Sequence, residues 1–130
     1  MNQKRAPESL EVVVVDDDPD IRRLIALALE RDGFEVTVFE DGLSALRGAC
    51  RRPRLILLDY MMPTMNAAGF LQAREGHPWL GRVPVVVISA YPELADNVAA
   101  ETVGVLHKPI DLDILLECVR YHCQRSAPPT

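Results

Sequence analysis

The stretch LILLDYMMP, residues 55–63, decides the fold of this 130-residue chain. Its four consecutive branched apolar residues lie between Pro53 and Pro63. Such a run is too short for a buried helix and is typical of a strand that is covered on both faces. Asp59 ends this strand. Because open parallel sheets place their ligands outside the carboxyl ends of the strands, Asp59 is a candidate site residue.

A second run of the same kind, VVVV at residues 12–15, is followed by Asp16, Asp17 and Asp18. If the two strands are parallel neighbours, their carboxylates crowd one crevice and oppose each other's ionisation. A hard divalent cation balances such charge, so we expect Mg²⁺, with Mn²⁺ as the alternative ion. The competing interpretation is a solvated turn that caps a helix, because Asp before Pro19 also suits a helix start.

The composition indicates one globular domain. A hydrophobic content of 48% with 25% charged residues fits neither a disordered chain nor a membrane protein. We expect the domain at residues 11–124, after a frayed N-terminal segment (1–10) and before a Pro-rich tail (125–130). No apolar signal segment follows the polar N-terminus, so the prediction for location is the cytoplasm.

The charge argues against a nucleic-acid-binding protein, and the cysteine content argues against a disulfide-linked or cysteine-ligated metal protein. A net charge of -5 without a Lys/Arg-rich tract argues against direct binding to nucleic acid. The cysteines Cys50, Cys118 and Cys123 cannot all pair, and none has the spacing of a metal site. Reduced, structural thiols are therefore expected.

Apolar periodicity predicts three more strands and five helices around these two strands. Further strands are expected at 35–39, 84–88 and 104–107, and helices at about 67–75, 92–102 and 111–123, with earlier helices ending at Gly33 and beginning at Asp41. The apolar faces of the first, second and last helices are predicted to comprise Ile21, Leu24, Ile25, Ala28 and Leu29; Leu43, Ala45, Leu46 and Ala49; and Ile114, Leu115, Cys118, Val119 and His122.

Five strands alternating with five helices predict an α/β fold. It is a doubly wound, flavodoxin-like parallel sheet with right-handed crossovers and helices on both faces. The most hydrophobic strands are expected in the centre, which is compatible with the order 2-1-3-4-5. This order brings the polar residues at the strand ends to one crevice: Asp16, Asp17, Asp59, Ser89 and Lys108. Alternatively, Lys108 is an ordinary surface lysine and Ser89 a turn-forming hydroxyl.

Four segments together resemble the receiver domain of two-component response regulators, of the chemotaxis-regulator kind. They are VVVVDDDPDIRRL, LILLDYMMPTM, VPVVVISA and HKPIDLDILL, and the resemblance covers about residues 11–123. It implies that Asp59 accepts a phosphoryl group, Lys108 is the family's lysine and Ser89 its switch hydroxyl. It also implies that Mg²⁺ is held by Asp17, Asp59 and the main-chain carbonyl of Met61, with Asp16 acting largely through water.

The resemblance further implies a signalling role. A phosphohistidine on a sensor histidine kinase or a histidine phosphotransfer protein would be the donor, and a protein-interaction surface would respond. The chain would catalyse only its own phosphorylation and slow dephosphorylation, so it is not an enzyme in the usual sense. We expect a monomer or weak dimer with an unknown output partner and no contact with nucleic acid or membrane.

The sequence departs from the family pattern at several positions. Val105 stands where receivers typically have Tyr or Phe, which excludes an aromatic rotamer switch there. Asn66 and Ala67 replace an Asp-Gly pair, and Ala resists positive φ, so we expect a different loop after the third strand. The short segment between Ser89 and Lys108 predicts an irregular fourth helix. Bulky Met61 and Tyr91, two residues after Asp59 and Ser89, suggest a long-lived acyl phosphate.

Three alternative functions stay open at this point. The first is a receiver-like docking module that phosphorylation does not regulate, which Val105 permits. The second is a small Mg²⁺-dependent phosphohydrolase, although Met61 occupies the usual place of its acid/base and the chain has little room for a cap. The third is a flavodoxin-like cofactor binder, which the missing Gly-rich phosphate loop disfavours.

Overall fold

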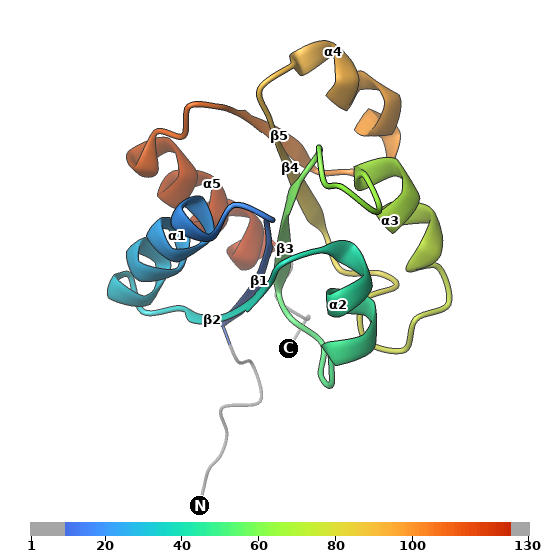
Figure 1. The fold of residues 1–130 in the computed structure, drawn as a ribbon. Coiled ribbons are helices and arrows are strands. Elements are labelled where there is room, and N and C mark those ends of the chain that lie inside the picture. Colours follow the sequence, from blue (N-terminus) through green and yellow to red (C-terminus); the bar gives the residue numbers. More distant parts are fainter. Residues whose placement is uncertain (1–9, 126–130) are drawn as a thin grey trace, which may run out of the picture.

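A five-stranded parallel sheet in the order β2-β1-β3-β4-β5 forms the centre of the fold, as predicted (Figure 1). The computed structural model describes residues 10–125. The strands are β1 (Glu11–Val15), β2 (Glu35–Phe39), β3 (Leu55–Asp59), β4 (Val85–Ser89) and β5 (Gly104–His107). The helices are α1 (Pro19–Arg31), α2 (Gly42–Gly48), α3 (Ala67–Ala73), α4 (Pro92–Ala95), the 3-10 helix η2 (Asp96–Glu101) and α5 (Leu112–Arg125).

Helices cover both faces of this sheet. Figure 1 shows α1 and α5 on one face and α2, α3 and α4 on the other. Every residue of β1, β3 and β4 is buried, whereas the edge strands β2 and β5 are only partly buried. Successive side chains of a strand point to opposite faces, so each central strand contributes to two separate hydrophobic clusters. The uninterrupted apolar runs of the sequence are explained by this two-sided burial.

Polar residues fix the ends of the helices where the sequence predicts them. The Asp41 carboxylate accepts a hydrogen bond from the Ser44 amide at the start of α2, and the Asp111 carboxylate caps α5. Helix α1 ends where Gly33 adopts a φ of 97°, a conformation that side chains with a Cβ rarely adopt. Each of these three helix ends therefore lies close to the residue that the sequence predicts.

The predicted apolar faces were partly wrong. Leu24, Leu43 and Ile114 were expected on buried faces, but their side chains are exposed. A helix that packs on a sheet buries a narrow line of residues spaced by about one turn. In α5 this line is Leu115, Val119 and Cys123, and Ile114 lies about 100° around the helix from it.

The region after β4 has the irregular form that its short length predicts. Helix α4 spans only four residues and continues into the 3-10 helix η2. Ala95 and Val98 are nevertheless buried against α3 and the sheet. Val105 is partly buried and packs on the same cluster.

Most of the predicted N-terminal segment and tail, residues 1–9 and 126–130, lies outside the described residues. Between residues 10 and 125, no helix has the length and apolar character that a membrane span requires.

Candidate functional site

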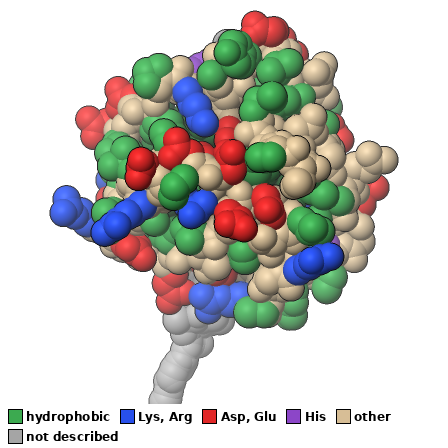
Figure 2. Space-filling view, viewed as in Figure 1, with side chains coloured by type: hydrophobic (Ala, Val, Ile, Leu, Met, Phe, Trp, Pro, Cys, Tyr) green, Lys and Arg blue, Asp and Glu red, His purple; other side chains and the backbone are tan. Residues whose placement is uncertain are grey.

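The carboxyl ends of the strands bring the predicted site residues to one edge of the sheet. Asp16 directly follows β1, Asp59 is the last residue of β3, and Ser89 is the last residue of β4. Lys108 follows β5, and its amide donates a hydrogen bond to the carbonyl of Ser89 at 2.9 Å. Figure 2 shows acidic side chains gathered over the middle of this face, with a basic side chain among them.

Three carboxylates lie close enough together to share one cation. Asp16, Asp17 and Asp59 each offer an oxygen, and these oxygens all lie within 4.8 Å of one another. Asp16 and Asp59 are buried, whereas Asp17 is exposed. Within the described residues, Asp16 Oδ2 is buried without any hydrogen-bond partner. Such an atom is costly unless something positive faces it.

Lys108 is the cation that faces this group. Its Nζ lies 3.2 Å from Asp59 Oδ1 and 3.9 Å from Asp16 Oδ2. One ammonium against three carboxylates leaves two negative charges without compensation. The side chain of Lys108 is 25% exposed, so it is neither an ordinary surface lysine nor fully enclosed.

Burial dominates the acidity of the two buried carboxyl groups. Desolvation, followed by repulsion from Asp16, raises the pKa of Asp59 to about 6, against the opposing attraction of Lys108. Desolvation also raises the pKa of Asp16, although the hydrogen bond from the Asp18 amide acts in the opposite direction. Both pKa shifts therefore arise mainly because burial disfavours the charged form of the carboxyl group.

The arrangement fits a divalent cation with oxygen ligands. Mg²⁺ binds oxygen at about 2.1 Å in an octahedron, so its ligands lie about 3 Å or about 4.2 Å apart. The carboxylate oxygens lie up to 4.8 Å apart, so binding Mg²⁺ requires either a small inward movement of a carboxylate or a water between one carboxylate and the ion. The unpartnered Asp16 oxygen and the two uncompensated charges are the features that such an ion would satisfy.

The competing interpretation of the acidic run as a helix cap holds for one residue of the three. The Asp18 carboxylate accepts hydrogen bonds from the amides of Asp20 and Ile21 at the start of α1. Asp16 and Asp17 instead belong to the group around Asp59. The acidic run thus divides into two members of the carboxylate group and a helix cap.

Arg22 contributes to the site, and the sequence reasoning missed it. Its Nη1 donates a hydrogen bond of 2.8 Å to the main-chain carbonyl of Asp16. The contact holds the acidic turn against the first turn of α1. Its position four residues after the Asp18 cap was the available signal, because that spacing places the side chain on the same side of the helix.

The hydroxyl of Ser89 is engaged within its own turn. It donates to the Tyr91 carbonyl at 2.9 Å and accepts from the Tyr91 amide at 3.0 Å. Ser89 is therefore a turn-forming residue in this conformation, as the alternative interpretation held, although it lies at the correct strand end. Reaching a ligand at Asp59 would require both hydrogen bonds to break.

Four further residues near the site were singled out by the sequence: Met61, Tyr91, Asn66 and Ala67. The side chains of Met61 and Tyr91 are each 57% exposed. Asn66 accepts a hydrogen bond from the Gly69 amide and caps α3, while Ala67 is the first residue of that helix. No described non-glycine residue has a positive φ, so Ala67 is not strained.

Comparison with known proteins identifies the family. Residues 12–120 match the sequence profile of the response regulator receiver domain. The chain belongs to this family. It is therefore a receiver domain of the kind found in two-component response regulators, which histidine kinases phosphorylate and which generally bind Mg²⁺.

Several curated transcriptional regulators are similar to this receiver domain. CseB of Streptomyces avermitilis is 36% identical over 117 residues, which cover 87% of this chain and 48% of CseB. KdpE of Escherichia coli is 36% identical over 125 residues, 92% of this chain and 53% of KdpE. NtrC of Escherichia coli, a DNA-binding transcriptional regulator, is 36% identical over 91% of this chain and 26% of NtrC. The receiver domain thus spans about half or less of these relatives.

Solved structures show the same fold. The Vibrio cholerae chemotaxis protein CheY4 is 28% identical with a TM-score of 0.76, and the match covers 85% of this chain and 96% of CheY4. The receiver domain of the Francisella response regulator 1452 is 26% identical with a TM-score of 0.77, covering 90% of this chain and 98% of that structure. The flavodoxin-like fold class predicted from the sequence is confirmed.

Proposed function

We propose that Asp59 accepts a phosphoryl group in a two-component phosphorelay and that this modification switches a protein-interaction surface. The observation that carries the proposal is the position of the Asp59 carboxylate, buried at the end of β3 with Lys108 Nζ 3.2 Å away and two further carboxylates beside it. A carboxylate at this place is a suitable nucleophile, and the group around it suits transfer of a charged phosphoryl group.

In the proposed reaction an Asp59 oxygen forms a bond to phosphorus while the bond between phosphorus and the imidazole nitrogen of the donor breaks. The electron pair of that bond stays with the imidazole. Lys108, already an ion-pair partner of Asp59, would then hold a phosphoryl oxygen. Asp17, Asp59 and the Met61 carbonyl, with Asp16 through water, would bind Mg²⁺, which neutralises charge on the transferring group.

The response would begin at Ser89. The phosphoryl group places acceptor oxygens at Asp59, and the Ser89 hydroxyl can exchange its two hydrogen bonds with Tyr91 for one of them. Because Ser89 ends β4, that exchange would draw the segment toward α4 inward. Because Val105 is not aromatic, any response at β5 must proceed without an aromatic rotamer change.

The proposed partners are a sensor histidine kinase or a histidine phosphotransfer protein, together with an unidentified output protein. We further propose that the domain, residues 11–124, acts in the cytoplasm as a monomer or weak dimer. Its catalytic role is confined to its own phosphorylation and slow dephosphorylation.

The chemistry can be tested with phosphoramidate, a small donor that has a phosphorus–nitrogen bond as phosphohistidine does. In Mg²⁺ buffer, intact-mass spectrometry should show the addition of one phosphoryl group, and mild alkali should remove it as expected of an acyl phosphate. The Asp59→Asn variant should not be labelled. Undiminished labelling of this variant would reject Asp59 as the acceptor.

The matched control is Asp20→Asn, an exposed carboxylate of α1 outside the group of three. It should be labelled at the same rate as the parent chain. The docking-module alternative predicts no labelling of any variant. The phosphohydrolase alternative predicts repeated turnover of small phosphate esters.

A further inference from the structure

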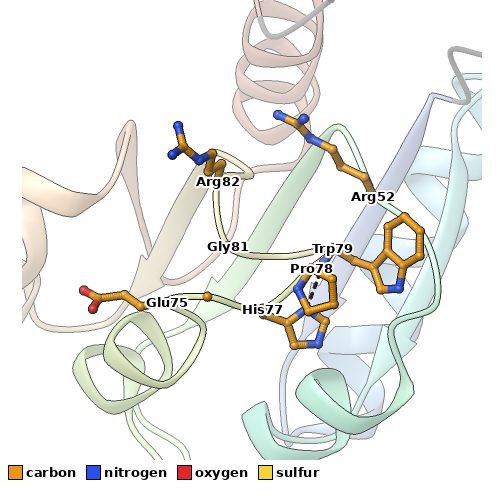
Figure 3. A pocket seen from close by; sticks show the side chains of 8 residues that line it. Arg52, Glu75, His77, Pro78, Trp79, Gly81 and Arg82 are labelled. Atoms are coloured by element: carbon orange, nitrogen blue, oxygen red, sulfur yellow. Dashed lines mark hydrogen bonds between the residues drawn. The ribbon is translucent and has the colours of Figure 1, made fainter.

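A groove of about 510 Å³ lies at the amino-terminal edge of the sheet, opposite the carboxylates around Asp59. The loop between α3 and β4 forms most of its wall, and Arg52, from the loop before β3, completes it (Figure 3). Trp79, the only tryptophan of the chain, lines the groove with 42% of its surface exposed. None of the roles assigned above uses this groove.

Hydrogen bonds hold the loop in one shape. His77 Nε2 lies 2.8 Å from the Leu46 carbonyl, and His77 Nδ1 accepts from the amides of Trp79 and Leu80 at 3.1 Å each. This pattern requires the proton on Nε2. A Cβ at Gly81 would meet the His77 carbonyl at 2.8 Å, so the loop also requires glycine there. The indole is therefore presented by a fixed backbone.

Two guanidinium groups border the groove. Arg52 and Arg82 make no hydrogen bond or ion pair with any described residue. In Figure 3, Arg52 lies beside Trp79 and Arg82 lies on the other side of Gly81. Glu75, the one acidic residue of the lining, points away from Trp79. In a chain of net charge -5, this groove is a local site of positive charge.

We propose that the groove binds a purine nucleotide. The base would stack on the indole of Trp79, and the phosphates would receive paired hydrogen bonds from Arg52 and Arg82. The volume lies within the range of small-molecule sites. An acidic peptide fits less well, because the amides of Trp79, Leu80 and Gly81 already have acceptors and offer no main-chain pairing.

The fluorescence of Trp79 reports directly on this site. The chain, in buffer with a chelator that removes divalent cations from the Asp59 site, is titrated with GDP, GTP, ADP and ATP, with correction for absorption by the purine. At least one nucleotide should quench the emission to saturation. Guanosine, adenosine and pyrophosphate should each bind roughly ten-fold or more weakly, because each keeps only half of the contacts.

Substitutions separate this site from general electrostatic attraction. Arg52→Gln and Arg82→Gln should each weaken binding roughly ten-fold, as measured by the same titration. Arg23→Gln, which removes an exposed guanidinium of α1, should leave the affinity unchanged. By calorimetry, Trp79→Phe should retain binding and Trp79→Ala should lose it. Circular dichroism verifies that each variant is folded.

Three results would overturn the proposal. The first is the absence of saturable quenching by any of the four nucleotides. The second is equal affinity for pyrophosphate and nucleotide, or a loss of affinity in Arg23→Gln as large as that in Arg52→Gln and Arg82→Gln. Either result would mean unspecific anion binding. The third is displacement of the nucleotide by tetraglutamate at lower concentration, which would assign the groove to an acidic peptide. None of these outcomes depends on phosphorylation of Asp59.

Discussion

Asp59 is subject to two opposing requirements. Its side chain is nearly fully buried beside Asp16, which favours the protonated form and raises its pKa to about 6. A nucleophile or metal ligand must be ionised. A pKa of about 6 still leaves the carboxylate mostly ionised at pH 7, and Lys108 is the group that keeps it from rising further. The folded chain therefore holds an anion that its surroundings only partly stabilise.

The first prediction concerns stability against pH. Because the folded pKa of Asp59 lies above the unfolded value near 3.8, protonated Asp59 favours the fold, and this contribution is lost as the pH rises from about 4 through about 6. With a chelator present, Asp59→Asn should therefore be more stable than the parent at pH 7.5, by at most about 3 kcal/mol. Urea unfolding followed by circular dichroism measures the difference.

The same comparison at pH 4.5 provides the control, because the parent is then largely protonated and the advantage of Asp59→Asn should shrink. Asp20→Asn, an exposed position, should show no comparable pH dependence. An advantage of Asp59→Asn that stays constant between the two pH values would contradict the assigned cause.

A second prediction concerns Met61 and Tyr91, whose exposed side chains stand two residues after Asp59 and Ser89. If they obstruct a water that attacks the acyl phosphate, the double variant Met61→Asn with Tyr91→Glu should lose its phosphoryl group several-fold faster than the parent. Intact-mass spectrometry after removal of the donor gives both rates. Equal rates would show that neither side chain shields the phosphate.

For individual residues, the sequence predicted positions in the fold better than side-chain directions. The carboxylates and Lys108 were predicted because each follows an apolar strand, and parallel strands end at one edge. The engagement of the Ser89 hydroxyl with Tyr91 could not be predicted, because a rotamer depends on the folded turn. Arg22 was missed because its partner is a main-chain carbonyl, so that only its spacing from Asp18 pointed to the contact.

Among the elements, the strands were predicted with near-correct bounds and the helices less well. Strands buried on both faces produce unbroken apolar runs, as in β1, β3 and β4. Helix faces depend on which neighbours cover them. The line Leu115, Val119 and Cys123 of α5 is buried by the sheet and α1, whereas Ile114 has no cover. The apolar periodicity of the sequence alone does not determine how a helix is rotated about its axis.

A third prediction concerns the loop between α3 and β4. His77 links three main-chain groups there, so His77→Ala leaves two amides without their acceptor and should cost about 1–3 kcal/mol of folding free energy. His107→Ala, at an exposed position, should change stability by less than about 0.5 kcal/mol. Urea unfolding of both variants gives the comparison. Equal stabilities would mean that water replaces the histidine without loss.

For the whole molecule, the order of strands followed from hydrophobicity and the rules of chain crossover. Few strand orders are compatible with three apolar central strands, two more polar edge strands and right-handed connections. The order 2-1-3-4-5 is the one observed. The helical faces and the groove beside Trp79 could not be derived in this way. They arise from contacts between segments far apart in sequence, such as His77 with Leu46.

The fourth prediction concerns Mg²⁺ and the stability of the whole domain. An ion that binds only the folded chain at ten times its Kd should stabilise it by ~1.4 kcal/mol. The melting temperature should therefore rise with Mg²⁺ concentration for the parent and for Asp20→Asn. It should rise much less for Asp17→Asn, which removes one of the three carboxylates. An equal rise in all three proteins would place the ion elsewhere.

The carboxyl edge of the sheet is acidic. Asp16 and Asp17 follow β1 and Asp59 ends β3, and Lys108 is the ammonium that faces them. At the opposite edge, Arg51 is already paired with Glu11 and Glu35. A phosphohistidine protein with a basic surface would be steered toward the acidic end before contact, and added salt should slow that encounter more than it slows the chemical step.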